Sequence, residues 1–164
     1  MHVNFAAKGI IQIDDARIIY RNFSGTPSQY NRAGDRNFAV VIPDADIADA
    51  LIENGWNVTI KQPREDGDAP FMYLKVKVKF NESGTTPRVY LKTGKNMNKL
   101  DEESVSCLDQ VDIACVDLDL RPYDWEINGK TGRTAYLQSI CVTQEIDRFA
   151  AQFAEEEAPE EVPF

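Results

Sequence analysis

Residues 72–80 read MYLKVKVKF, and this stretch decides how the chain folds. Successive side chains of a β-strand point to opposite faces. One face of this strand is therefore apolar and suited to a core, while the other carries a phenol ring followed by three ammonium groups. The apolar face consists of Leu74, Val76, Val78 and Phe80, and the polar face consists of Tyr73, Lys75, Lys77 and Lys79.

A second strand with the same alternation follows at residues 88–92, after a short connection that contains glycine. Arg88, Tyr90 and Lys92 share its polar face. Two strands joined this closely predict an antiparallel hairpin. Such a hairpin would merge the two polar faces into one surface with five cations, two phenol rings and no carboxylate.

The composition is that of one globular domain. The chain has 164 residues, of which 43% are hydrophobic and 27% charged. No apolar run approaches the ~20 residues of a membrane span, and the N-terminus lacks the features of a signal peptide. We therefore expect no membrane association and a cytoplasmic location.

The cysteines and the histidine exclude several kinds of chemistry. Cys107, Cys115 and Cys141 are odd in number and lack the spacing of metal ligands, which predicts reduced, structural thiols. His2, the single histidine, lies at a terminus, so the sequence lacks the histidines that a histidine-based catalytic or zinc site requires. We expect no cofactor, no metal and no catalytic residues.

The net charge of −9 is unevenly distributed. Residues 61–99 hold nine basic and four acidic side chains, whereas residues 155–164 hold five glutamates and no base. A basic centre can contact phosphates even in an acidic protein, because local charge sets those contacts.

The remaining pattern alternates strands and turns. Residues 9–23 predict a long strand with a bulge at Asp14–Asp15, and an aspartate cap starts a helix that ends near Asn54. Asn128–Gly129 predicts a hairpin turn, and residues 145–157 have helical spacing. The loop at residues 24–36 carries one ring and two guanidinium groups, and it is either a binding loop or an ordinary solvated one.

This order of elements favours a mainly β fold: a single OB-type (Greek-key) barrel over residues 1–154, with one or two short helices. A disordered acidic tail follows at residues 155–164. OB-type barrels bind single strands with a cationic groove for the backbone and aromatic faces for the bases. The residues expected to contact nucleic acid are Tyr30, Arg32, Arg36, Lys61, Tyr73, Lys75, Lys77, Lys79, Arg88, Tyr90, Lys92 and Lys95.

Several segments resemble the phage-encoded single-stranded-DNA-binding proteins that have an OB fold and an acidic C-terminal tail. They are YNRAGDRNFAVVIP at residues 30–43, YLKVKVKF at 73–80, VDLDLRPYDWEINGKTGRTAYL at 116–137, and the terminal EEVPF. The resemblance implies that the protein coats exposed strands during phage replication or recombination in the host-cell cytoplasm. It also implies that the tail recruits replication or recombination proteins, through Glu160, Glu161, Val162, Pro163 and Phe164.

The tail has a second predicted effect, because a tethered polyanion competes with DNA for a cationic groove. Two other functions remain open. One is a metal-dependent nuclease that uses Asp112, Asp117, Asp119 or Glu126. The other is a protein-interaction adaptor whose acidic tail is its main activity and whose lysines only protect an edge strand from aggregation. The sequence leaves open whether the protein is a monomer or a dimer, and whether it prefers DNA or RNA.

Overall fold

The computed structural model describes residues 1–81 and 86–146, and this part of the chain is mainly β. Its strands form one ten-stranded sheet, accompanied by one α-helix and two short 3₁₀ helices. The elements are β1 (His2–Phe5), η1 (Ala7–Gly9), β2 (Ile11–Ala16), β3 (Ile18–Asn22), β4 (Arg36–Ile42), α1 (Ala45–Glu53), β5 (Val58–Lys61), β6 (Phe71–Val78), β7 (Arg88–Thr93), β8 (Asn96–Leu100), η2 (Val105–Asp109), β9 (Ile113–Ile127) and β10 (Lys130–Gln144).

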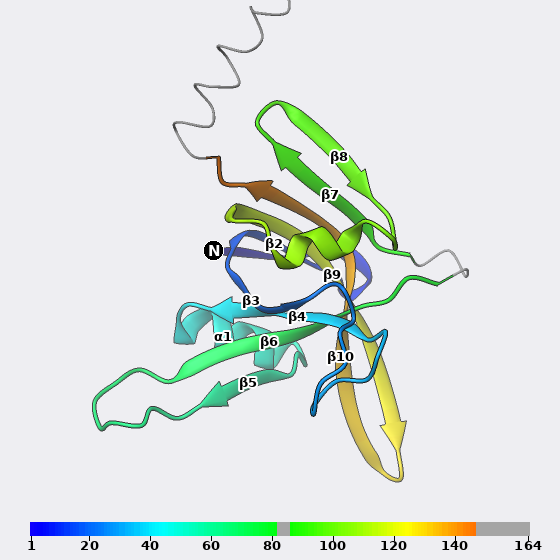
Figure 1. Ribbon diagram of the computed structural model, residues 1–164. Helices are drawn as coiled ribbons and strands as arrows, with labels where there is room; N and C mark the ends of the chain where they lie inside the picture. Colours follow the sequence, from blue (N-terminus) through cyan, green and yellow to red (C-terminus); the bar gives the residue numbers. More distant parts are fainter. Residues whose placement is uncertain (82–85, 147–164) are drawn as a thin grey trace, which may run out of the picture.

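The long strand β10 organises the sheet. It pairs with β9 along its whole length, and its other edge pairs with β6 and then β7, both in parallel (Figure 1). The strands follow the order β1-β2-β9-β10-β6-β4-β3. Within the described residues β1 and β3 do not pair with each other, so the sheet curls around the core without closing. The expected mainly β class with a short helix is confirmed.

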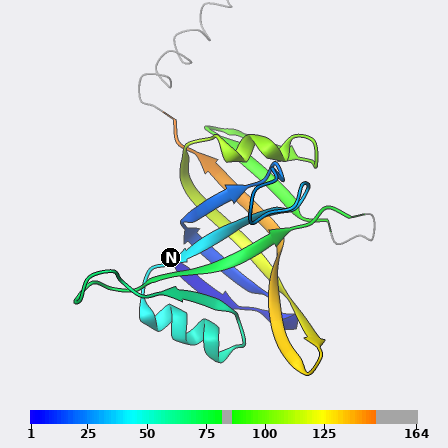
Figure 2. The same ribbon diagram turned by 60° about the horizontal axis from the view of Figure 1, so that its bottom comes forward.

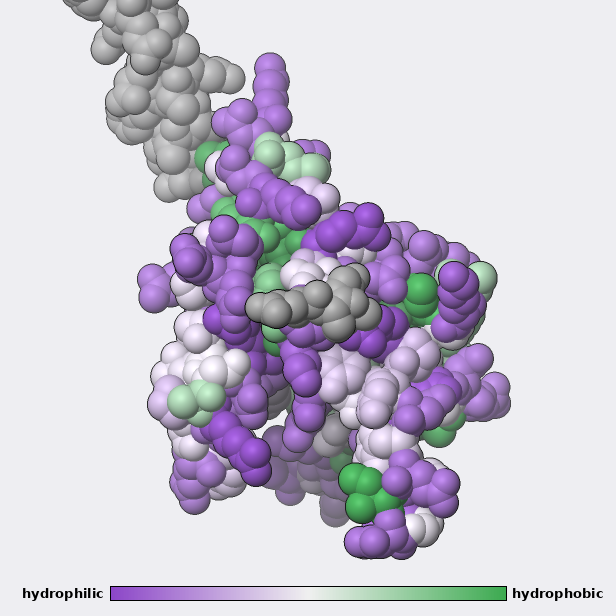
Figure 3. All heavy atoms as spheres, turned by 90° about the vertical axis from the view of Figure 1, so that its right-hand side faces the viewer, coloured by the Kyte–Doolittle hydropathy of each residue, from purple (hydrophilic) through white to green (hydrophobic). Residues whose placement is uncertain are grey.

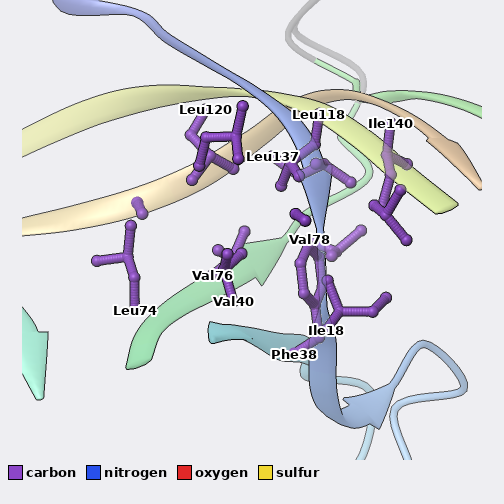
Figure 4. Packing of buried hydrophobic residues seen from close by; sticks show 14 of the residues in the cluster. Ile18, Phe38, Val40, Leu74, Val76, Val78, Leu118, Leu120, Leu137 and Ile140 are labelled. Atoms are coloured by element: carbon purple, nitrogen blue, oxygen red, sulfur yellow. The ribbon is translucent and has the colours of Figure 1, made fainter. Parts of the chain in front are cut away.

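The core lies between two parts of the curled sheet. Side chains from β9 and β10 point toward side chains from β4 and β6 (Figure 4). Leu74 and Val76 are at most 1% exposed, which confirms the apolar face that the alternation predicts. The residues labelled in this cluster are Ile18, Phe38, Val40, Leu74, Val76, Val78, Leu118, Leu120, Leu137 and Ile140.

Several local signals are also confirmed. The Asp44 carboxylate accepts a hydrogen bond from the Ile47 N–H and caps α1. The bulge predicted near Asp14–Asp15 is present, because the β2–β9 register shifts there and Asp15 has a φ of 53°. Asn128 has a φ of 51° and begins the turn between β9 and β10, as the Asn-Gly pair predicts.

The hairpin predicted from residues 72–80 and 88–92 is wrong. Strands β6 and β7 do not pair with each other; they lie one after the other along the same edge of β10. Strand β7 forms its antiparallel hairpin with β8 instead, through a turn at Gly94. The polar residues of the two strands therefore do not lie side by side as in a hairpin, and they line two different hollows.

No helix in the described part of the chain is long and apolar enough to cross a membrane. The helix predicted at residues 145–157 falls almost entirely outside the described residues, and the predicted tail at residues 155–164 lies wholly outside them.

Candidate nucleic-acid interface

A groove of about 890 Å³ crosses the outer face of β4 and β6, on the side opposite the core. The sheet forms its floor, and the loop between β3 and β4 forms one wall. Five of the residues expected to contact nucleic acid line it. The lining residues that this argument uses are Tyr20, Tyr30, Asn31, Arg36, Lys75, Lys77, Lys79 and Tyr136.

The lysines of β6 lie on the floor of this groove. Lys75 is opposite Ala39 of β4, while Lys77 has Asn37 on one side and Tyr136 of β10 on the other. Lys75, Lys77 and Lys79 are exposed, and none forms an ion pair with another residue that the structure describes. Lys75 and Lys77 of β6, with Lys79 directly after its end, thus form a row of ammonium groups without ion pairs to described residues, which suits a row of phosphates.

Strand β6 is an interior strand. It pairs with β4 on one side, and with β5 and then β10 on the other. Lysines that protect a protein from aggregation lie on edge strands, whose backbone groups are unpaired. Edge protection, the explanation that the adaptor interpretation gives for these lysines, therefore does not account for them.

The wall of the groove is held in shape by Asn31. Its side-chain amide donates to the carbonyl oxygens of Thr26, Arg32 and Asp35 at 3.0–3.1 Å. Its side-chain oxygen accepts a hydrogen bond of 2.9 Å from the Asn37 amide on β4. This network ties the loop to the floor of the groove, so the neighbouring side chains are presented in a defined position.

Two tyrosines offer ring surface in the groove. Tyr30, next to Asn31, is 91% exposed, and Tyr20 on β3 is 59% exposed. Tyr73 points to the same side of the sheet as Lys75, as its position in the strand predicts, but it is only 5% exposed. The prediction that Tyr73 offers a stacking surface is wrong in this respect, because other side chains cover its ring. The rings of Tyr20 and Phe71 lie 5.6 and 5.7 Å from it, and the Lys61 ammonium lies 5.6 Å away.

The two arginines expected in the loop differ in availability. The Arg36 guanidinium donates to the Phe23 carbonyl, forms an ion pair with Glu102 at 3.4 Å, and lies 5.5 Å from the Phe80 ring. It therefore holds the ends of the loop together as well as lining the groove. Arg32 is exposed on the same loop but does not line the groove.

The other predicted cations lie elsewhere. Arg88 and Tyr90 line a separate hollow of about 300 Å³, together with Asp14, Asp117 and Asp119. Three carboxylates make this hollow a poor site for a polyanion. Lys92 follows on the same strand and Lys95 lies just beyond it, before β8, so neither extends the groove.

Two carboxylates of β9, those of Asp117 and Asp119, have structural partners. Asp117 accepts a hydrogen bond from the Asp15 N–H, and Asp119 accepts one from the Ser139 hydroxyl. Residues 1–81 and 86–146 contain no group of three or more acidic, cysteine or histidine side chains that could hold a metal ion. Cys141 lies in the same hollow, where burial and the nearby Asp117 carboxylate raise the pKa of its thiol.

Two of the groove rings, Tyr20 and Tyr136, were not among the residues expected from the sequence. Tyr20 has the same parity as the buried Ile18, so alternation places it in the core. A φ of 54° and a shifted β3–β4 register turn it outward instead. Tyr136 lies between the buried Ala135 and Leu137, and this alternation is a signal that could have identified it.

A family model described as a putative phage ssDNA-binding domain matches residues 3–162. Among solved structures, the chain is similar to the single-stranded DNA-binding protein from bacteriophage Enc34 in complex with ssDNA. The TM-score is 0.55 at 16% sequence identity, with 90% of this chain and 93% of that chain covered. A second structure of the Enc34 protein gives a TM-score of 0.53 at 14% identity, with coverages of 90% and 87%. At these identities the likeness concerns the fold, and a comparison with curated proteins gave no match.

Proposed function

The chain belongs to the family of putative phage ssDNA-binding domains, and on this premise we propose that it binds single-stranded DNA without sequence preference. The phosphates of the strand lie along Lys75, Lys77 and Lys79, and the bases stack on Tyr30 and Tyr20. This division of labour, cations for the backbone and rings for the bases, is the general one for sequence-tolerant binding.

One observation carries the proposal: three exposed lysines without ion-pair partners among the described residues line an open groove, two of them on the interior strand β6 and the third directly after it. The wall of that groove presents a ring that is 91% exposed. Each stacked base contributes about 1–3 kcal/mol, and each phosphate contact adds a salt-dependent part. The Enc34 protein, whose fold this chain shares, is described in complex with ssDNA.

The test is a titration of a fluorescent oligo-dT with the full-length protein at two salt concentrations, with duplex of the same length as competitor. We expect tight binding that salt weakens and that duplex does not displace. Tyr30→Ala should lower the affinity and leave the salt dependence unchanged, because a ring contact releases no counterions. Failure of the full-length protein to bind at either salt concentration would remove the proposal.

We further propose that the protein coats exposed strands during phage DNA replication or recombination. Residues 1–154 then form the binding domain, and residues 155–164 form an acidic tail that recruits replication or recombination proteins through its terminal EEVPF. The support is the sequence of the tail, with five glutamates before a terminal phenylalanine.

The same tail competes with DNA for the groove, because tethering gives it a high effective concentration. Deletion of residues 155–164 should therefore tighten oligo-dT binding, most strongly at low salt. Equal affinities of the full-length and truncated proteins at low salt would contradict the competition. A pull-down with a peptide that ends in EEVPF, against one that lacks the final phenylalanine, tests recruitment separately.

A further inference from the structure

The β9–β10 hairpin extends well beyond the body of the protein. Residues 121–127 of β9 and 130–134 of β10 pair only with each other, because the pairing of β9 with β2 stops at Leu120 and that of β10 with β6 at Ala135. We call residues 121–134 the arm. It projects from the body as a two-stranded ribbon (Figures 1 and 2).

One face of the arm is fastened to the body through Arg133. The guanidinium binds the Asp124 carboxylate at 2.6 and 3.1 Å and donates to the Asn54 carbonyl at the end of α1. It also lies 5.2 Å from the centroid of the buried Trp56 ring. The hydrogen bond with Arg133 lowers the pKa of Asp124, so this carboxylate stays ionised and the pair stays intact at neutral pH. The arm is therefore held in a fixed position by one face.

The opposite face carries aromatic rings in a row. Tyr123 and Trp125 alternate along β9 and are 54% and 36% exposed. The Tyr123 ring meets the Tyr136 ring edge to face at 5.9 Å, and the Arg121 guanidinium lies 4.8 Å from the Tyr136 ring. These rings contribute little to the core, and their exposure leaves them available to a ligand.

The position of Trp125 depends on the residue opposite it. Trp125 pairs with Gly132 on β10, and a Cβ atom at Gly132 would lie 2.2 Å from the indole ring. The indole therefore covers the backbone of Gly132 closely, which no other residue type at that position would permit. A glycine within a strand often marks such a close approach.

The carboxylates of the arm are confined to one of its faces. Alternation places Arg121, Tyr123, Trp125 and Ile127 on the ring-bearing face, together with Lys130, Gly132 and Thr134 from β10. Both carboxylates of the arm, Asp124 and Glu126, lie on the other face. A face with rings and cations but no carboxylate suits a polyanion that carries flat bases.

The ring-bearing face continues directly from the groove. Tyr136 lines the groove and pairs with Lys77 of β6, while its ring contacts Arg121 and Tyr123 at the base of the arm. In Figure 3, pale, weakly polar side chains form a band in the lower part of the molecule, where the arm lies, and a green, hydrophobic patch lies near its lower end. Alternate residues on a strand are about 6.7 Å apart, so neighbouring nucleotides can reach neighbouring rings.

We propose that the ring-bearing face of the arm is a second base-stacking subsite, on which the single strand continues from the lysine groove over Tyr136, Tyr123 and Trp125. This inference rests on the proposed function and extends its site. The occupant is single-stranded DNA, because the face adjoins the phosphate-binding lysines and carries no acidic group of its own.

The test compares arm variants in the oligo-dT titration with full-length protein. Trp125→Ala and Tyr123→Ala should each weaken binding about tenfold, with an unchanged salt slope. Thr131→Ala, on the opposite face of the arm, should bind like the wild type. Gly132→Val keeps every ring but displaces the indole, and it should weaken binding as Trp125→Ala does.

Fluorescence gives an independent readout. The two tryptophans are the buried Trp56 and the exposed Trp125. Stacking on a base should quench the emission of Trp125 when oligo-dT is added. Trp125→Phe retains a ring and should therefore bind with nearly wild-type affinity, while the DNA-dependent quenching disappears. Circular dichroism confirms that each variant is folded.

The outcomes separate this inference from the proposed function. If Lys77→Ala weakens binding but Trp125→Ala and Tyr123→Ala do not, the arm subsite is overturned and the lysine groove stands. If the wild type does not bind oligo-dT, both proposals fail. If sedimentation shows a dimer that Trp125→Ala dissociates while the DNA affinity is unchanged, a second copy of the chain occupies this face and the inference is again overturned.

Discussion

Replacing the groove lysines by alanine should reduce the salt dependence of DNA binding by an amount that the structure predicts. Each phosphate contact on a single strand contributes about 0.7 to the slope of log affinity against log salt. Lys77 is paired between Asn37 and Tyr136 at the centre of the groove floor, so Lys77→Ala should remove one contact. The triple variant that also replaces Lys75 and Lys79 should lower the slope by about 2.

The assay is an oligo-dT titration at several salt concentrations. Between about 50 and 200 mM salt, the loss of affinity should be about 2.5-fold smaller for Lys77→Ala than for the wild type, and about 20-fold smaller for the triple variant. Lys99→Ala is the matched control, because Lys99 is exposed on β8, outside the groove. Arg88→Ala should also leave the slope unchanged, since Arg88 lies among carboxylates. An equal decrease in slope for Lys77→Ala and Lys99→Ala would refute the assignment of the phosphates to the groove.

Three further predictions concern the parts that support the groove. Asp109→Ala should lower the free energy of unfolding by about 2 kcal/mol in a urea titration, because its carboxylate accepts two backbone N–H bonds from the start of the β3–β4 loop; Asp109→Asn, which keeps one acceptor oxygen, should lose less. The loss of oligo-dT affinity in Asn31→Ala should be larger than its loss of thermal stability accounts for, since the substitution releases the loop that presents Tyr30; an unchanged affinity would contradict this. Cys115 and Cys141 should react slowly with thiol reagents at pH 8 until the protein is unfolded, because burial raises the pKa of both thiols above the ordinary value for cysteine and less thiolate is present at a given pH.

The sequence predicts those features that depend on neighbouring residues. The alternation in residues 72–80 correctly separates the buried Leu74 from the exposed Lys75, because side-chain direction is a local property of a strand. The turn at Asn128–Gly129 is likewise local, since its backbone conformation requires φ values that these two residue types tolerate.

The choice of strand partners is not local, and there the prediction failed. The connection between β6 and β7 is longer than the two-residue turns that specify a hairpin. Both strands find a partner in β10, whose residues are more than forty positions further along the chain. The burial of Tyr73 has the same origin, because its ring is covered by Tyr20 from a distant strand.

The unequal pairing along β10 has a consequence for how the protein opens. Residues 139–143 are hydrogen-bonded to β9 on one side and β7 on the other, whereas residues 130–134 are bonded to β9 alone. Backbone amides in the first segment can exchange with deuterium only when the sheet as a whole comes apart, while those in the second exchange through local fraying. The molecule thus has a slow-exchanging centre and a fast-exchanging extremity within a single strand. Substitutions at that extremity should therefore lower the free energy of unfolding less than substitutions in residues 139–143 do.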